Sequence, residues 1–233
     1  MKTNKIIFKA QNEHVWHVRE RPFPAIKKLP DWWRQMSPYY NLDNSIDLTR
    51  ESIPTVKKCF PTLDAIGAGY IVPLWADLLV QKDKMPQLTW STDLPVLERW
   101  DSFQVSNYEI PEGFSSSVYK YLHGWTIKTP PGWSCFISHP IGYQNLPFRS
   151  ISGVVDTDLL DTDINTPFVV KKDFEGVIEK GTPMFQIIPF KREKWESDFI
   201  LQKPNEHFFN SEKLKTKILS AYGRHVRSNK SYK

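Results

Sequence analysis

Cysteine and glycine are scarce in this chain of 233 residues. Two cysteines, Cys59 and Cys135, cannot build the dense disulfide framework that a secreted domain of this size usually carries. No signal peptide is recognisable, because the first apolar run, at 6–8, is broken by Lys9 and Gln11. No apolar stretch approaches the roughly 20 residues that cross a bilayer. We therefore expect a protein without membrane contact, working in the cytoplasm or inside an assembled particle.

Proline and aromatic residues are abundant instead, with eighteen prolines and nine tryptophans. Proline fixes its own φ and lacks a backbone donor, so this many prolines favour short strands joined by stiff turns. Aromatic residues make up 14% of the chain, which argues against general disorder. The tryptophans can fill a core, or they can form an aromatic surface that binds extended peptides, glycans or partner subunits. Both interpretations stay open at this point.

Alternating apolar residues predict an all-β fold, a β-roll or sandwich, that occupies residues 1–233 as a single domain. A short helix is expected at 30–36, a loop at 112–119, and an edge strand or bulge within 71–80. Residues 125–129 and 133–139 alternate around Pro130-Pro131-Gly132, which predicts a hairpin. Further strands are expected at these ranges: 5–9, 55–60, 151–156, 168–171, 176–178 and 183–190.

The formal net charge of +5 is concentrated near the C-terminus, where residues 210–233 form a predicted helix followed by a basic tail. A cap at Asn210 and a stop at Gly223 are expected to bound this helix. Basic tails can contact phosphates. A solvated terminus explains the same charges more simply, so we do not expect nucleic acid to be a partner.

Asp156 and Asp158 are the first candidates for chemistry. One residue separates them, so on a strand both carboxylates project to the same side. Such a pair can raise one partner's proton affinity or share a cation, and both effects serve catalysis. The alternative is a turn at the end of a strand, in which the aspartates accept backbone N–H bonds.

Other polar residues give weaker signals. His14 and His17 have a spacing that can hold a metal on a helix, but their segment is expected to be extended, and no third ligand lies nearby. We therefore expect no metal site there. Cys59 follows two lysines, which favours a reactive thiol, whereas a buried cysteine is the commoner case. A basic rim for an anion could form from scattered cationic residues if the fold gathers them: Lys57, Lys58, Arg149, Lys180 and Arg192.

The segment 149–190 contains G-V-V-D-x-D at 153–158, an apolar strand, and K-G-T-x-x-x-Q-I-I at 180–188. In this order of motifs it resembles the dUTPase and dCTP-deaminase superfamily. In that β-roll the first motif supplies an aspartate that activates water or contacts the sugar, and the second helps to hold the nucleotide. The resemblance implies a catalytic role for Asp156, with Asp158 beside it. It also implies ligand-binding roles, which we assign to Gln186, Arg149, Asp64 and Lys180.

The chain also departs from the superfamily's pattern. Pro183 stands near the place of the phosphate-binding arginine, and proline can neither carry charge nor donate from its backbone. Tyr70 occupies the place of an expected acid, and no glycine-rich segment follows near the C-terminus. These differences argue against an intact triphosphate site.

Longer motifs are spread along the chain, among them R-P-x-P-A-x-K-x-x-P-x-W-W at 21–33, T-V-K-K-C-x-P-x-x-D-A-x-x-x-G-Y at 55–70 and K-G-T-P-M-x-Q-I-I-P-F-K-R-E-x-W at 180–195. With these motifs the sequence is similar, over nearly its full length, to a family of tailed-phage and bacterial proteins of unknown function. This resemblance implies a phage origin and no particular activity.

Two hypotheses of function follow. The first is a non-enzymatic binding or assembly module that needs no cofactor and associates with itself or with other phage proteins, in the infected host's cytoplasm or in the virion. The second is a nucleotide-handling enzyme in which Asp156 activates water and Gln186 positions the ligand. There, Asp158 or Asp64 would assist a Mg²⁺ ion.

Overall fold

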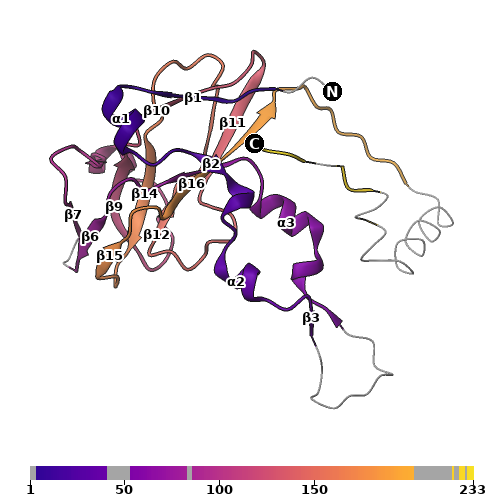
Figure 1. Cartoon of the computed structure of the whole chain (residues 1–233), viewed down its shortest axis with the longest axis horizontal. Helices are drawn as coiled ribbons and strands as arrows, with labels where there is room; N and C mark the ends of the chain where they lie inside the picture. The colour runs from indigo at the N-terminus through magenta and orange to yellow at the C-terminus, as the bar shows by residue number, and fades with distance from the viewer. Residues whose placement is uncertain (1–3, 41–52, 83–85, 202–221, 223–225, 229) are drawn as a thin grey trace.

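The computed structural model describes residues 4–40, 53–82, 86–201, 222, 226–228 and 230–233. In this part of the chain the paired strands all run antiparallel and form several sheets, with a few short helices beside them (Figure 1). The all-β class predicted from the sequence is confirmed. None of the described helices is long and apolar enough to span a bilayer.

Two larger sheets and one smaller sheet make up the body. The largest has the strand order β13 (Gly153–Val155), β11 (Trp133–Ser138), β16 (Pro183–Lys191), β5 (Tyr70–Pro73) and β2 (Phe23–Pro24). The second has the order β12 (Phe148–Ser150), β14 (Thr166–Lys171), β9 (Phe114–Tyr121) and β8 (Leu97–Arg99). The third has the order β15 (Gly176–Ile178), β6 (Leu78–Gln81) and β7 (Gln87–Trp90).

Shorter elements complete the fold. Two strand pairs stand apart from the larger sheets: β1 (Ile7–Ala10) with β10 (Trp125–Lys128), and β3 (Tyr39–Tyr40) with β4 (Ile53–Pro54). The α-helices are α1 (Glu13–Val18), α2 (Asp31–Gln35) and α3 (Phe60–Ile66). Three short 3-10 turns are present at η1 (Ala25–Lys27), η2 (Val56–Lys58) and η3 (Ser102–Val105). The predicted helix at 30–36 is therefore confirmed as α2.

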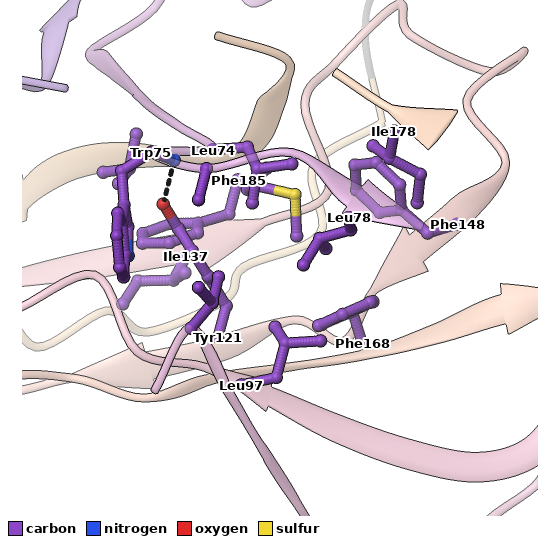
Figure 2. Packing of buried hydrophobic residues seen from close by; sticks show 14 of the residues in the cluster. Leu74, Trp75, Leu78, Leu97, Tyr121, Ile137, Phe148, Phe168, Ile178 and Phe185 are labelled. Atoms are coloured by element: carbon purple, nitrogen blue, oxygen red, sulfur yellow. Dashed lines mark hydrogen bonds between the residues drawn. The ribbon is translucent and has the colours of Figure 1, made fainter. Parts of the chain in front are cut away.

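One cluster of buried apolar residues joins all three larger sheets. It includes Phe185 from β16, Phe168 from β14 and Leu78 from β6 (Figure 2). The buried hydroxyl of Tyr121 accepts a hydrogen bond from the Trp75 backbone N–H at 2.9 Å and donates one to the Pro73 carbonyl at 2.7 Å. This polar group is thereby satisfied inside the core, as a buried hydroxyl must be.

Proline explains two local features. The apolar run 71–80 divides into β5 and β6, and the pairing of β5 with β16 shifts register between Pro183 and Phe185, opposite Pro73. The extra residue of this register shift lies on β16, opposite the run 71–80. The run supplies no edge strand, because β5 lies between β16 and β2 and β6 lies between β15 and β7. The strand predicted at 55–60 was wrong, since η2 and the start of α3 occupy it. Pro61 in the first turn of α3 favours a helix start, because a proline there loses no helical hydrogen bond.

The predicted hairpin at 125–139 was only half right. Its turn exists, with Gly132 at φ +83°. However, β10 pairs with β1 and β11 pairs with β13 and β16, so the two strands enter different sheets. The loop predicted at 112–119 was also wrong, because β9 covers most of it and buries Ser115 and Ser117 between its neighbours. The position of β9 between β14 and β8 outweighs the low strand propensity of its serines.

The segment with His14 and His17 is the helix α1, capped by the Asn12 side chain, and not the extended chain that was expected. Asn12 accepts a hydrogen bond from the Val15 N–H at 3.0 Å, which stabilises this start. The predicted C-terminal helix, which begins after Asn210, falls almost wholly within the range 202–221, which lies outside the described residues.

Candidate functional site

Of the candidate site residues, Gln186 lies on the largest sheet, and Asp156 and Asp158 directly follow its edge strand β13, whereas Asp64, Arg149 and Lys180 lie on other elements. Strand register places Val154, Phe136 and Ile188 in one row across β13, β11 and β16. The next row toward one end holds Ser134 and Phe190, and the next row toward the other end holds Ser138 and Gln186. Because side chains alternate between the two faces of a strand, these rows share a face.

Arg192 binds both candidate aspartates just beyond the end of β16. Its guanidinium donates two hydrogen bonds to the Asp158 carboxylate, at 2.8 and 2.5 Å, and one to Asp156 at 3.1 Å. Ser134 donates to Asp156 at 2.6 Å, and the Gly132 N–H donates to Asp158 at 2.8 Å. The two carboxylates do share a cation, as their spacing allowed, and this cation is the guanidinium of Arg192.

The two aspartates differ in their surroundings. The Asp158 side chain is 5% exposed, whereas that of Asp156 is 54% exposed. The hydrogen bonds from Arg192, helped by the Gly132 N–H, lower the pKa of Asp158 to about 2. Asp158 is therefore a permanent anion at neutral pH, and its contacts join the turn after β13 to the 130–132 turn and the end of β16.

Gln186 is fully buried and has a backbone partner for both ends of its amide. Its Oε1 accepts a hydrogen bond from the Ile141 N–H at 2.8 Å. Its Nε2 donates to three carbonyls at the end of α3, those of Ala65, Ile66 and Ala68, with the shortest distance, 2.6 Å, to Ala68. The contacts of the Gln186 amide in this structure are thus structural, all with backbone groups of the chain, and the ligand-binding role stays a prediction.

Asp64 on α3 binds the C-terminal segment. Arg227 donates to its carboxylate at 2.6 and 3.2 Å, and Lys230 donates at 2.9 Å. The hydrogen bond from Arg227 is the main reason why the pKa of Asp64 is lowered. Tyr232 stacks edge-on against Tyr70 nearby, with ring centroids 6.0 Å apart. The described part of the basic tail thus lies against the body, and its charge partly neutralises Asp64.

Lys180 and Arg149 lie in different surroundings. The Lys180 ammonium pairs with Glu20 at 3.4 Å, and its backbone N–H donates to Asp77 at 2.6 Å. Lys180 borders a groove of about 680 Å³ between α2, the loop 142–146 and the turn 179–183. Arg149 lies exposed on β12, opposite Val169 in the second sheet.

The basic rim considered from the sequence does not form among the described residues, because its members have separate partners. Lys57 donates to the Arg34 carbonyl, and Lys58 lies over the Tyr39 ring. Arg192, a member of that set, proved to be the centre of the aspartate cluster. No sequence signal could have identified it, because its place beside Ser134 depends on the pairing of β16 with β11.

The two cysteines differ in their burial. Cys135 is fully buried, and burial raises the pKa of its thiol to about 11, so the thiolate is not formed at neutral pH. Cys59 is half-buried at the start of α3. No group of three or more His, Cys, Asp or Glu residues that could hold a metal ion occurs in the described ranges.

Sequence reasoning missed an exposed apolar segment that follows β16. We call residues 192–201 the arm. It leaves the body as extended chain and runs away from the sheets (gold in Figure 1). Its four large apolar side chains, Trp195, Phe199, Ile200 and Leu201, are 84–97% exposed. The sequence signal was available, because W-E-S-D-F-I-L follows a strand without helical or strand periodicity.

Comparisons of the chain with protein-family models, with curated proteins and with solved structures found no match. The resemblance to the dUTPase and dCTP-deaminase superfamily therefore stays a prediction.

Proposed function

We propose that this protein is a non-enzymatic binding and assembly module of phage type, built on a dUTPase-like β-roll, which associates with further copies of itself. The exposed arm carries the proposal. Four large apolar side chains within seven residues are almost fully exposed to water, although isolated exposed apolar residues are common on any protein. A contiguous apolar segment of this kind marks a surface that is covered on association.

The state of the candidate catalytic groups supports the same proposal. The two aspartates are bound to Arg192, and Gln186 is satisfied by backbone groups. In a nucleotide-handling enzyme these groups would face water or the ligand, whereas Oδ1 of Asp156 accepts from Ser134 and Arg192 and the Gln186 amide bonds to backbone groups. We propose no Mg²⁺ site, and place the protein's work in the infected host's cytoplasm or in the virion.

A mass measurement in solution tests the assembly. We expect light scattering to give a multiple of the 27.3 kDa chain mass, and the combined variant Trp195→Ser, Phe199→Ser to give the single-chain mass. Phe103→Ser is the matched control, because Phe103 is also a strongly exposed aromatic residue but lies on η3, outside the arm. A wild-type chain that is a strict monomer at high concentration would contradict the proposal.

Nucleotide titration tests the enzymatic alternative. We expect no change in Tm with a panel of dNTPs and Mg²⁺, since a ligand that binds only the folded state raises stability by mass action. A rise in Tm that disappears in Asp156→Asn would reject the non-enzymatic proposal and restore Asp156 to a ligand site.

A further inference from the structure

The outer face of the largest sheet carries an uncovered apolar strip. We call Val154, Phe136, Ile188 and Phe190 the Phe136 strip. The first three form one cross-strand row, and Phe190 follows Ile188 on the same face of β16. Val154 is 61% exposed, Phe136 and Phe190 are each 37% exposed, and Ile188 is partly buried. Four neighbouring apolar side chains thus face outward on a sheet whose opposite face lies in the core.

Other parts of the chain cover one end of the outer face of the largest sheet, and this cover ends beside the Phe136 strip. At Gln186, one row away, hydrogen bonds hold the end of α3 and Ile141 over the sheet. On the other side of the strip lies a polar cluster in which Arg192 and Asp156 are partly exposed and Ser134 is buried. The strip is therefore an apolar band between a covered end and a polar end of one sheet face. Such a position suits a segment laid across the face from outside.

The arm has the chemistry to cover this band. Its side chains are apolar at Trp195 and at Phe199–Leu201, matching the apolar strip, whereas Glu196 and Asp198 between them can stay in water. Aromatic residues bury roughly 150–250 Å² each, so Trp195 and Phe199 alone would bury at least ~300 Å² per arm. Two exchanged arms, with the strips beneath them, would remove ~1,200 Å² from water, which reaches the size of stable interfaces.

The course of the chain favours the arm of another copy. The Arg192 N–H donates to the Gly132 carbonyl at 2.8 Å, which continues the direction of β16, and the Arg192 side chain is fixed on Asp158. To cover its own strip, the arm would have to reverse direction between Arg192 and Trp195. It runs on beyond the sheet instead (Figure 1). An arm arriving from a second molecule needs no such reversal.

We infer that the Phe136 strip is the surface that binds the arm of a second copy of this chain, so that neighbouring copies exchange arms. We call this binding surface the seat. This inference rests on the self-assembly proposed above and names its receiving surface. The occupant is the segment from Trp195 to Leu201.

Val154→Lys tests the seat, with Val177→Lys as its matched control. Both valines lie in three-residue strands and are similarly exposed, at 61% and 53%, but Val177 belongs to the third sheet. A lysine in the seat places a charge against the apolar arm, and we expect the dissociation constant of the assembly to rise roughly a hundredfold. We expect Val177→Lys to leave it unchanged. Circular dichroism checks that both variants fold.

Disulfide trapping tests the contact directly. Chains carrying Val154→Cys are mixed with longer-tagged chains carrying Phe199→Cys, both with Cys59→Ser, while the buried Cys135 is kept because its thiol is protonated. We expect a mixed-mass disulfide product after oxidation, and at least tenfold less product when Val177→Cys replaces Val154→Cys.

The outcomes separate the two proposals. A wild-type monomer would overturn both. An assembly that the arm variant dissolves but Val154→Lys leaves intact would overturn the seat alone. Equal trapping at 154 and 177 would also overturn the seat. A disulfide that forms within one chain carrying both Val154→Cys and Phe199→Cys, and not between chains, would show that the arm folds back on its own sheet.

Discussion

Replacing Asp158 tests whether its carboxylate serves to stabilise the fold. We expect Asp158→Asn to lower the urea midpoint at neutral pH, because it removes two hydrogen bonds to Arg192 from a nearly buried group. The bound state lowers the Asp158 pKa from 3.8 to about 2, so the ionised group contributes stability above pH 3.8 and loses it as the pH falls toward 2. The midpoints of wild type and variant should therefore converge in acid.

Asp156→Asn is the control for this prediction. Asp156 is largely exposed and accepts only one longer bond, of 3.1 Å, from Arg192, so we expect a smaller drop in the midpoint. Equal drops for the two variants, or a difference that persists at pH 2, would contradict this account.

His123 should make the fold sensitive to mild acid. Its Nδ1 accepts from the Trp125 N–H at 3.0 Å, which leaves Nε2 to donate to the Ile164 carbonyl at 2.6 Å. Burial lowers the pKa of His123 from 6.5 to about 4, so the neutral ring contributes stability above pH 6.5 that is lost as the pH falls to 4. The loss should be roughly 3 kcal/mol, measured by urea unfolding across this range.

His123→Gln removes this titration, and its pH profile of stability should be flatter between pH 6.5 and 4. His139, whose pKa burial also lowers, should keep part of the slope. An unchanged slope in the variant would assign the acid sensitivity to other groups.

The sequence motifs predicted which residues lie at the candidate site better than they predicted what those residues bind. Asp156 and Asp158 both contact Arg192, but they lie in the turn after β13 and not on a strand, and Asp158 accepts a backbone N–H bond there, as the turn alternative predicted. The partner that neutralises them lies 34 positions beyond Asp158, and spacing within a motif cannot reveal so distant a contact. Gln186 likewise looked free in the sequence, and only the fold shows that three carbonyls of another element use its amide.

Gly69 decides how β5 enters the largest sheet. It has φ +63°, and a Cβ at this position would lie 1.9 Å from the Ile187 carbonyl oxygen on β16. We expect Gly69→Ala to cost about 4 kcal/mol of unfolding free energy, since both the backbone conformation and the close approach exclude a side chain. Urea unfolding measures this cost.

Gly132→Ala is the matched control at the other turn. Gly132 has φ +83°, but nothing lies within 4 Å of its added Cβ, so only the conformational cost of about 1 kcal/mol is expected. Similar costs at both glycines would mean that the approach to Ile187 is not what requires Gly69.

Helices and strands were predictable where residues close together in the sequence determine them. The proline and aspartate at the start of α2 and the alternation of β11 were both readable. Pairing was not readable, because the partner of β10 is β1, more than 100 residues earlier, while its sequence neighbour β11 belongs to another sheet. Strand β9 was missed because burial between β14 and β8, and not its serine-rich sequence, makes it a strand.

For the whole molecule, association should couple stability to concentration. If copies bind each other only when folded, Tm must rise with protein concentration. We expect an increase of a few degrees per hundredfold concentration for the wild type, and none for the combined variant Trp195→Ser, Phe199→Ser. Differential scanning calorimetry measures both. A concentration-independent wild-type Tm would contradict the assembly.

The exposed arm also has an optical consequence. The chain holds nine tryptophans, and Trp195 is by a wide margin the most exposed of those that the structure describes. A dissolved quencher such as iodide would reach its indole before those of Trp33, Trp75 or Trp125, which lie in the interior. The fraction of intrinsic fluorescence open to iodide therefore reports whether the arm is seated, and the protein carries its own label for following that step in real time.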